Sequence, residues 1–171
     1  GFPLHAKLFS YLPLSHIAER MITELTGLTL GACITFAESL ETFGKNLAET
    51  QPHLFFGVPR IYAKFQEKIL EKLPQKKLGR LLSLPFINSF LRKKIKTNVG
   101  LLDAKVVGAG AAPVAASLIR WFSTLGITMR DIYGMTENAG FCTFNLRAIK
   151  IGRVGQPWPG VEVKLSKEGE I

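Results

Sequence analysis

Residues 131–138 (Asp-Ile-Tyr-Gly-Met-Thr-Glu-Asn) gather several chemically useful side chains in one short run. Tyr133 offers a flat ring on which a base can stack, and Gly134 allows a sharp turn of the backbone. Thr136 offers a hydroxyl group to a phosphate oxygen, and Glu137 supplies a hard carboxylate oxygen of the kind that Mg²⁺ prefers. These residue types predict a nucleotide and magnesium site. The alternative interpretation is a polar loop with a helix cap.

A second candidate is the small-residue turn at 108–113 (Gly-Ala-Gly-Ala-Ala-Pro). Small side chains let a ligand approach the backbone, and a helix that starts at Pro113 would offer free N–H groups. Gly108 and Gly110 nearly match the dinucleotide-binding pattern, with Asp131 near the end of the next expected strand. Because proline replaces the third small residue, three interpretations stay open: an NAD site of a Rossmann enzyme, a structural turn, or another nucleotide-facing loop.

Apolar runs that alternate with helical patterns must position these segments. Strands are expected at 8–12, 32–36, 54–58, 104–107 and 127–132, and helices at 15–25, 39–49, 59–73 and 113–125. Ser15 and Ser39 are the expected caps of their helices. Strands separated by helices predict an α/β fold with a layered, largely parallel sheet flanked by helices. The 131–138 run then leaves its strand at the carboxyl end, where open α/β sheets place ligands.

The expected domain organisation is a partial α/β core at 1–151, followed by the beginning of a β-rich subdomain at 152–171, where Gly and Pro punctuate short β-like runs. The chain lacks an initiating Met and stops after one residue of what resembles a returning strand. We therefore expect a piece of a longer polypeptide, truncated at both ends; the alternative is a processed or frayed terminus.

The composition excludes several classes of protein. With 171 residues and 47% hydrophobic residues, the chain can bury a core, which excludes intrinsic disorder. Cys33 and Cys142 are too few for a disulfide framework or a zinc cluster. The net charge of +9 is local, because residues 60–96 hold eleven basic and two acidic residues and the remainder is neutral. No nucleic acid partner is expected, since a protein that coats nucleic acid is basic over its whole surface.

The end of this basic segment is amphipathic. Apolar residues fall near one helical face: Phe86, Ile87, Phe90, Leu91 and Ile95. Four basic residues cluster towards the C-terminal half of the same segment: Arg92, Lys93, Lys94 and Lys96. Such a helix at 85–98 can lie on an anionic membrane, which makes a membrane-surface binding module an alternative function. Equally, its apolar side can face the core while the lysines are solvated.

The run at 133–138 resembles the Tyr-Gly-x-Thr-Glu motif of the adenylate-forming superfamily, which contains the acyl-CoA synthetases. Gly-Ala-Ala-Pro at 110–113 and Gly-Arg-Val-Gly-Gln-Pro at 152–157 are similar to other motifs of that family, in the same order. Three further segments resemble the long-chain fatty-acyl-CoA synthetases: Leu-Pro-Leu-Ser-His-Ile-Ala-Glu-Arg at 12–20, Phe-Ala-Glu-Ser-Leu-Glu-Thr at 36–42 and Val-Pro-Arg-Ile-Tyr at 58–62. The resemblance covers nearly the whole chain.

The resemblance implies a reaction in two steps. A fatty acid carboxylate attacks the α-phosphorus of Mg·ATP to give acyl-adenylate and pyrophosphate, and the thiol of CoA then displaces AMP. It also implies that Tyr133 stacks on adenine while Gly110, Ala111 and Ala112 line the adenine and acyl pocket. The other residues of the nucleotide-binding run are Asp131, Ile132, Gly134 and Met135.

By the same resemblance, Thr136 contacts the α-phosphate, Glu137 holds Mg²⁺ and His16 lies near the acyl carboxylate. The alternative for His16 is a buried, hydrogen-bonded structural residue. The phosphate loop with its lysine, the ribose-binding Asp and the catalytic Lys of the family match nothing in this sequence. We therefore expect the isolated chain to lack ligase activity. A separate expectation is that the parent enzyme is cytoplasmic and peripheral at the inner face of the membrane.

Overall fold

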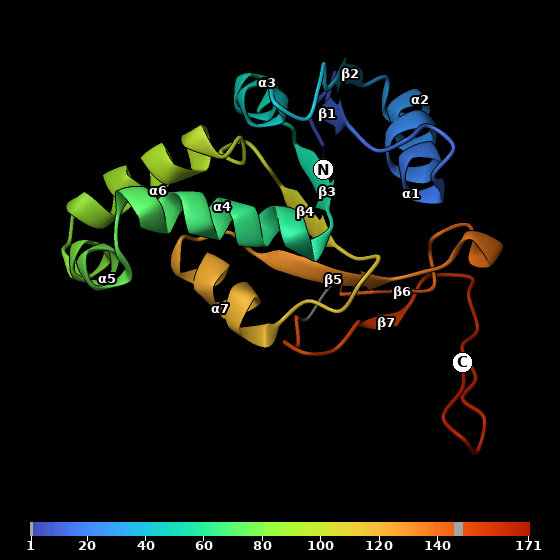
Figure 1. Cartoon of the computed structure of the whole chain (residues 1–171). Coiled ribbons are helices and arrows are strands. Elements are labelled where there is room, and N and C mark those ends of the chain that lie inside the picture. The colour runs from blue at the N-terminus through green and yellow to red at the C-terminus, as the bar shows by residue number, and fades with distance from the viewer. Residues whose placement is uncertain (1, 146–148) are drawn as a thin grey trace.

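The computed structural model describes residues 2–145 and 149–171. Its centre is a seven-stranded sheet in the order β2-β1-β3-β4-β5-β6-β7 (Figure 1). The strands are β1 (Lys7–Ser10), β2 (Cys33–Phe36), β3 (Leu54–Gly57), β4 (Val106–Ala109), β5 (Met129–Tyr133), β6 (Thr143–Phe144) and β7 (Gln156–Pro157). The first five pair in parallel, whereas β6 and β7 join antiparallel. The predicted α/β fold with a largely parallel sheet is confirmed.

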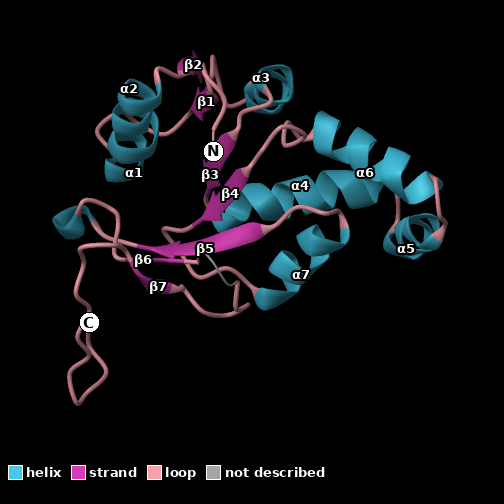
Figure 2. Ribbon diagram, turned by 180° about the vertical axis from the view of Figure 1, so that it is seen from behind, coloured by secondary structure: helices cyan, strands magenta, loops and turns pink. Residues whose placement is uncertain are grey.

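Helices connect the parallel strands, as Figure 2 shows. They are α1 (Ile17–Glu19), the π-helical turn η1 (Arg20–Leu25), α2 (Thr26–Leu30), α3 (Phe43–Thr50), α4 (Pro59–Lys72), α5 (Gln75–Ser83), α6 (Ile87–Asn98) and α7 (Ala116–Thr124). The 3-10 turn η2 (Thr136–Asn138) follows β5 and precedes the antiparallel β6. Among the described residues, no helix is both long enough and apolar enough to cross a membrane.

The two faces of the sheet are covered by different helices. On β1, Phe9 belongs to the main core and packs edge-on against Phe43 of α3. Its neighbour Leu8 points the other way: a Cβ built on Gly27 of α2 would lie 3.7 Å from the Leu8 side chain. This alternation is what a strand buried on both faces produces. The first face carries most of the core, whose largest fully buried side chains are Tyr62, Phe55 and Phe122.

Several helix ends differ from the sequence predictions for local reasons. The helix predicted from Ser15 begins after His16, whose Nδ1 accepts a hydrogen bond of 3.1 Å from the Ala18 N–H. The helix predicted from Ser39 begins only at Phe43, because the side chains of Ser39 and Thr42 accept hydrogen bonds from each other's backbone N–H. In the basic stretch after α4, α6 matches the helix expected at 85–98, whereas α5 falls where the sequence analysis named no element.

The C-terminal segment adds only β7 to the sheet within residues 152–171. This strand pairs with β6, and Trp158 just beyond it packs against Phe144 with ring centroids 5.4 Å apart. The division of the chain at residue 152 stays a prediction.

Candidate functional site

Two loops meet at the carboxyl ends of β4 and β5. These strands pair in parallel with Ala109 opposite Asp131, so the turn after β4 and the loop after β5 leave the sheet at the same edge. The contact between them is close: a Cβ at Gly110 would lie 2.9 Å from the carbonyl oxygen of Ile132 and 3.1 Å from the ring of Phe56. Glycine at this position therefore lets the two candidate segments touch through their backbones.

The loop after β5 is folded back on itself. The Met135 N–H donates to Oδ1 of Asn138 over 3.0 Å, and the Gly140 N–H donates to the Met135 carbonyl over 2.9 Å. A Cβ at Gly134 would collide with the backbone carbonyl of Gly140. This closed loop leaves Thr136 and Glu137 exposed to solvent at the edge of the sheet.

A cavity of about 60 Å³ lies where this loop faces α1 and η1. Its lining comes from four parts of the chain: His16, Ile17, Ala18, Met21 and Ile22; Phe56 of β3; Ala111 after β4; and Ile132, Gly134, Gly140 and Phe141 around the β5 loop. The structure therefore brings His16, Ala111, Ile132 and Gly134 together, although they are far apart in the sequence. Except for His16, the side chains around this space are apolar.

His16 stands exposed at the mouth of this cavity and caps the following helix. Because Nδ1 accepts the hydrogen bond from Ala18, the neutral ring carries its proton on Nε2, which is then a donor for an anionic group. The alternative predicted that His16 is a buried structural residue, and this is wrong because His16 is exposed. The hydrogen bond that the alternative also predicted is present, as the helix cap with the Ala18 N–H.

The remaining predicted residues lie around the cavity without lining it. Ala112, Met135, Thr136 and Glu137 are exposed, and Tyr133 is half-buried with its backbone carbonyl bonded to the Cys142 N–H over 3.1 Å. Gly110 is buried under the contact between the loops. The structure thus places the predicted residues at one edge of the sheet, except His16, which reaches that edge by lining the same cavity.

The carboxyl group of Asp131 is buried below the loop, and this burial raises its pKa above the ordinary value. In the dinucleotide interpretation this acid and the small-residue turn would serve NAD. However, α7 begins at Ala116, three positions after Pro113, so no helix N-terminus directly follows the glycines. A dinucleotide site needs that junction for its pyrophosphate, so the geometry disfavours the NAD interpretation.

Glu137 has the donor chemistry that magnesium requires. Its carboxylate is exposed on η2 and forms no ion pair with any described residue. The described residues include no group of three His, Cys, Asp or Glu that could hold a metal ion. A single carboxylate nevertheless fits Mg²⁺ that arrives with a nucleotide, because phosphate oxygens and waters then supply its other ligands.

Residues 2–170 match the model of the AMP-binding enzyme family. This chain belongs to that family. The match confirms the family resemblance that the sequence analysis drew from the motifs at 110–113, 133–138 and 152–157.

Relatives within the AMP-binding enzyme family are named as ligases of fatty acids. The long-chain-fatty-acid–CoA ligase heimdall of Drosophila melanogaster is 28% identical over 95% of this chain and 29% of its own length. The long-chain-fatty-acid–CoA ligase ACSBG2 of Xenopus laevis is 30% identical over 91% of this chain and 25% of its own length. The chain therefore spans less than a third of these curated relatives.

A solved structure of the same family has the same fold. The A-PCP didomain of a carboxylic acid reductase from Segniliparus rugosus, solved in complex with AMP, superimposes with a TM-score of 0.58. It is 25% identical to this chain, over 75% of this chain and 18% of its own.

Within this AMP-binding fold, the sequence analysis missed the apolar residues of the cavity. Met21 and Ile22 follow Ile17 and Ala18 at intervals of four, a helical spacing that could have placed them beside His16. Phe56 could have been assigned to this face because its neighbour Phe55 is buried in the main core on the opposite face. Phe141 carried no such signal, since it follows a turn.

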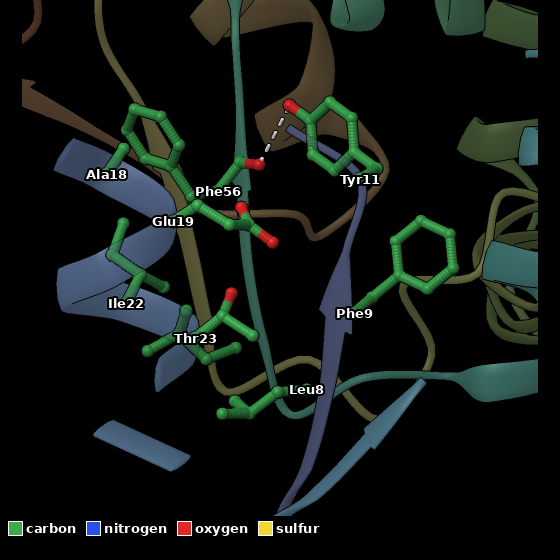
Figure 3. Close-up of a pocket in the computed structure, with 9 residues that line it drawn as sticks. Leu8, Phe9, Tyr11, Ala18, Glu19, Ile22, Thr23 and Phe56 are labelled. Atoms are coloured by element: carbon green, nitrogen blue, oxygen red, sulfur yellow. Dashed lines mark hydrogen bonds between the residues drawn. The ribbon is translucent and has the colours of Figure 1, made fainter. Parts of the chain in front are cut away.

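A smaller cavity of about 10 Å³ lies behind the site, between β1 and the first helices (Figure 3). Figure 3 shows the Glu19 side chain extending from α1 towards the strands, with Tyr11 and Thr23 in the same lining. The Tyr11 hydroxyl donates to the Phe56 carbonyl over 3.1 Å, and burial, with the nearby charge of Glu19, raises the Tyr11 pKa well above its ordinary value. Oε1 of Glu19 is buried without a hydrogen-bond partner, and the cavity has room for about one water molecule.

Proposed function

We propose that this chain forms part of the active site of a long-chain fatty acid–CoA ligase. The proposed enzyme activates a fatty acid with ATP to an acyl-adenylate and then forms a thioester with CoA. The observation that carries the proposal is the cavity of about 60 Å³, which places an apolar lining and the imidazole of His16 beside the small-residue turn and the β5 loop. The names of the relatives support the choice of a long-chain acid as substrate.

Each part of the site has a role that suits its chemistry. Met21, Ile22 and Phe56 contact the first carbons of the acyl chain and exclude water from them. The Nε2–H of His16 hydrogen-bonds an oxygen of the carboxylate or of the α-phosphate. Binding an acid here aligns its carboxylate oxygen with the nucleotide, which is the main contribution that positioning makes to a two-substrate reaction.

The nucleotide is bound by the β5 loop. Tyr133 stacks against adenine, Gly110, Ala111 and Ala112 lie along the base, and the Thr136 hydroxyl donates to a phosphate oxygen. Glu137 holds Mg²⁺, which neutralises phosphate charge when it is bound. Asp131, Ile132, Gly134 and Met135 hold this loop in place.

The test is fatty-acid-dependent exchange between ATP and pyrophosphate, measured with the complete ligase that contains this chain. We expect exchange with long-chain acids and none without an acid. The isolated chain of 171 residues should show no exchange, because the phosphate loop and catalytic Lys of the family match nothing in it. Exchange by the isolated chain, or none by the complete protein with any acid, would contradict the proposal.

Cell fractionation tests the accompanying proposal that the ligase is cytoplasmic and peripheral at the inner membrane face.

A further inference from the structure

The turn between α5 and α6 presents apolar side chains to solvent. Phe86 is 92% exposed and Phe90 is 69% exposed, and Leu84 and Ile87 are each 43% exposed. The single apolar face that the sequence suggested for 85–98 is therefore split. Ile95 is buried in the core and Leu91 packs against it, whereas the residues nearer the turn are exposed to solvent.

The backbone holds the Phe86 ring outward at a cost. Phe86 has φ 69° and ψ −49°, and the Ile87 N–H donates to the Pro85 carbonyl over 2.8 Å. These values describe a γ-turn of the rare, strained kind, in a conformation that bulky residues avoid. A strained turn that exposes a phenylalanine gains nothing for the folded chain alone, which suggests that the ring has a use outside it.

Positive charge surrounds this turn. Lys93 and Lys94 follow Phe90 by three and four residues, so they lie one helical turn from it, and both are exposed. On α5, which packs against α6, the exposed basic residues are Lys76, Lys77 and Arg80. No acidic residue occurs from 72 to 102. This segment therefore combines exposed apolar rings with cations and contains no carboxylate of its own.

We propose that this surface, which we define as residues 84–90 with Lys93 and Lys94, docks on an anionic lipid bilayer. Apolar rings that enter the acyl boundary and lysines that meet the headgroups are the two parts of interfacial binding. Both ribbon views place α5 at the opposite end of the molecule from η2 (Figures 1 and 2). Docking through this surface leaves the candidate site uncovered, and it does not depend on the proposed ligase activity.

The test is co-sedimentation of the chain with vesicles of phosphatidylcholine alone and of phosphatidylcholine mixed with phosphatidylserine. We expect binding to the anionic vesicles at low ionic strength and release at high salt. Phe86→Ser with Phe90→Ser should weaken binding at least about tenfold. Lys93→Gln with Lys94→Gln should weaken it about 30-fold, from about fivefold per lost charge.

Matched controls distinguish binding through this surface from nonspecific adsorption of other exposed side chains to the vesicles. Leu28→Ser with Leu40→Ser removes two side chains that are also more than 80% exposed, at 82% and 88%. Lys164→Gln with Lys167→Gln removes two exposed lysines near the C-terminus. Both control pairs should bind vesicles like the unaltered chain.

Three outcomes would overturn the proposal. The first is no binding to anionic vesicles at low salt, and the second is equal weakening of binding by the control pairs. The third is a dimer in light scattering that dissociates when Phe86 and Phe90 are changed, with no effect of these changes on vesicle binding. The last would show that a second copy covers this surface. Because all substituted side chains are exposed, circular dichroism should show every variant folded, and the lysine pair tests the surface independently of the phenylalanine pair.

Discussion

The hydroxyl group of Tyr62 donates a hydrogen bond of 2.7 Å to the backbone carbonyl of Gly108. Tyr62 lies on α4 and is completely buried, and burial raises its pKa well above the ordinary value, so the hydroxyl stays a donor. Gly108 lies on β4, two residues before Gly110, where the chain turns towards the candidate site. This bond therefore ties the helix that covers the core to the strand end that positions Gly110.

Replacing Tyr62 with Phe should leave the Gly108 carbonyl buried without its partner. We expect the free energy of unfolding to fall by about 1–3 kcal/mol, the usual cost of such an unsatisfied group. Tyr11→Phe is the control, because its hydroxyl bonds a carbonyl over 3.1 Å at a part-buried position, and its loss should cost less. Urea unfolding of both variants measures the difference, and an equal or smaller cost at Tyr62 would contradict this account.

Gly134→Ala should disturb the loop that carries the candidate nucleotide-binding residues. The new methyl group would collide with the Gly140 carbonyl, so the loop must open. We expect a loss of about 1–3 kcal/mol in the free energy of unfolding. Gly79→Ala on α5 is the matched control: nothing lies within 4 Å of its added Cβ, and alanine should stabilise the helix by up to about 1 kcal/mol. Equal urea midpoints for the two variants would show that the loop accommodates the added methyl group at position 134 and would contradict this prediction.

His53 should make stability depend on pH. Its Nδ1 accepts the Lys7 N–H over 2.9 Å, and burial, together with the charge of Lys7, lowers its pKa. Below about pH 6.5 the unfolded chain therefore binds more protons than the folded one. The contribution of His53 is complete above that pH and is lost as the pH falls towards the lowered pKa of the folded state.

Thermal unfolding measured between neutral and mildly acidic pH checks this prediction. His53→Asn keeps an acceptor at the same place but cannot titrate, so it should flatten the fall in Tm. His5→Asn, at an exposed histidine, should keep the slope of the unaltered chain. An unchanged slope for His53→Asn would assign the pH dependence to other groups.

Glu19→Gln should stabilise the chain at neutral pH. The change removes a charge from a side chain that is 3% exposed and whose Oε1 has no hydrogen-bond partner. We expect a gain of about 1 kcal/mol, since an unsatisfied buried group is costly. Glu24→Gln, on the same helical segment but with its carboxylate only 3.9 Å from Arg20 at the surface, should change stability by less than about 0.5 kcal/mol. Destabilisation by Glu19→Gln in calorimetry would indicate a bound partner for the carboxylate.

The sequence predicted the parallel part of the sheet because its inner strands β1, β3 and β4 are short, largely apolar runs with buried residues on both faces. It predicted the site edge as well, since Gly110 directly follows β4 and Tyr133 ends the neighbouring β5, and parallel strands share a carboxyl edge. Helix starts were less predictable, because Ser39 and Thr42 bond to each other and delay α3. In α5, the dense lysines hid the periodicity of the residues that pack inward, such as Leu78. The apolar face of α6 was recognised, but its division between a buried Ile95 and an exposed Phe86 was not.

The cavity could not be predicted from local patterns. Its lining joins Met21, Phe56 and Phe141, which only the strand order and the two-sided sheet bring together. The antiparallel β6 was missed for a different reason: with only Thr143 and Phe144, it is too short to show an alternating pattern. Long-range pairing decided both features.

Glu137→Ala should lower fatty-acid-dependent exchange between ATP and pyrophosphate in the complete ligase by at least about 100-fold. The reason is that Glu137 is the carboxylate proposed to hold Mg²⁺ against the phosphates, and metal neutralisation of that charge contributes several kcal/mol to catalysis. Because its side chain is exposed and pairs with no described cation, the unfolding midpoint should not change. Glu67→Ala, at an exposed carboxylate on α4, is the control and should keep full exchange. Raising the Mg²⁺ concentration should partly restore the Glu137 variant, whereas full exchange by Glu137→Ala at low Mg²⁺ would remove Glu137 from the metal site.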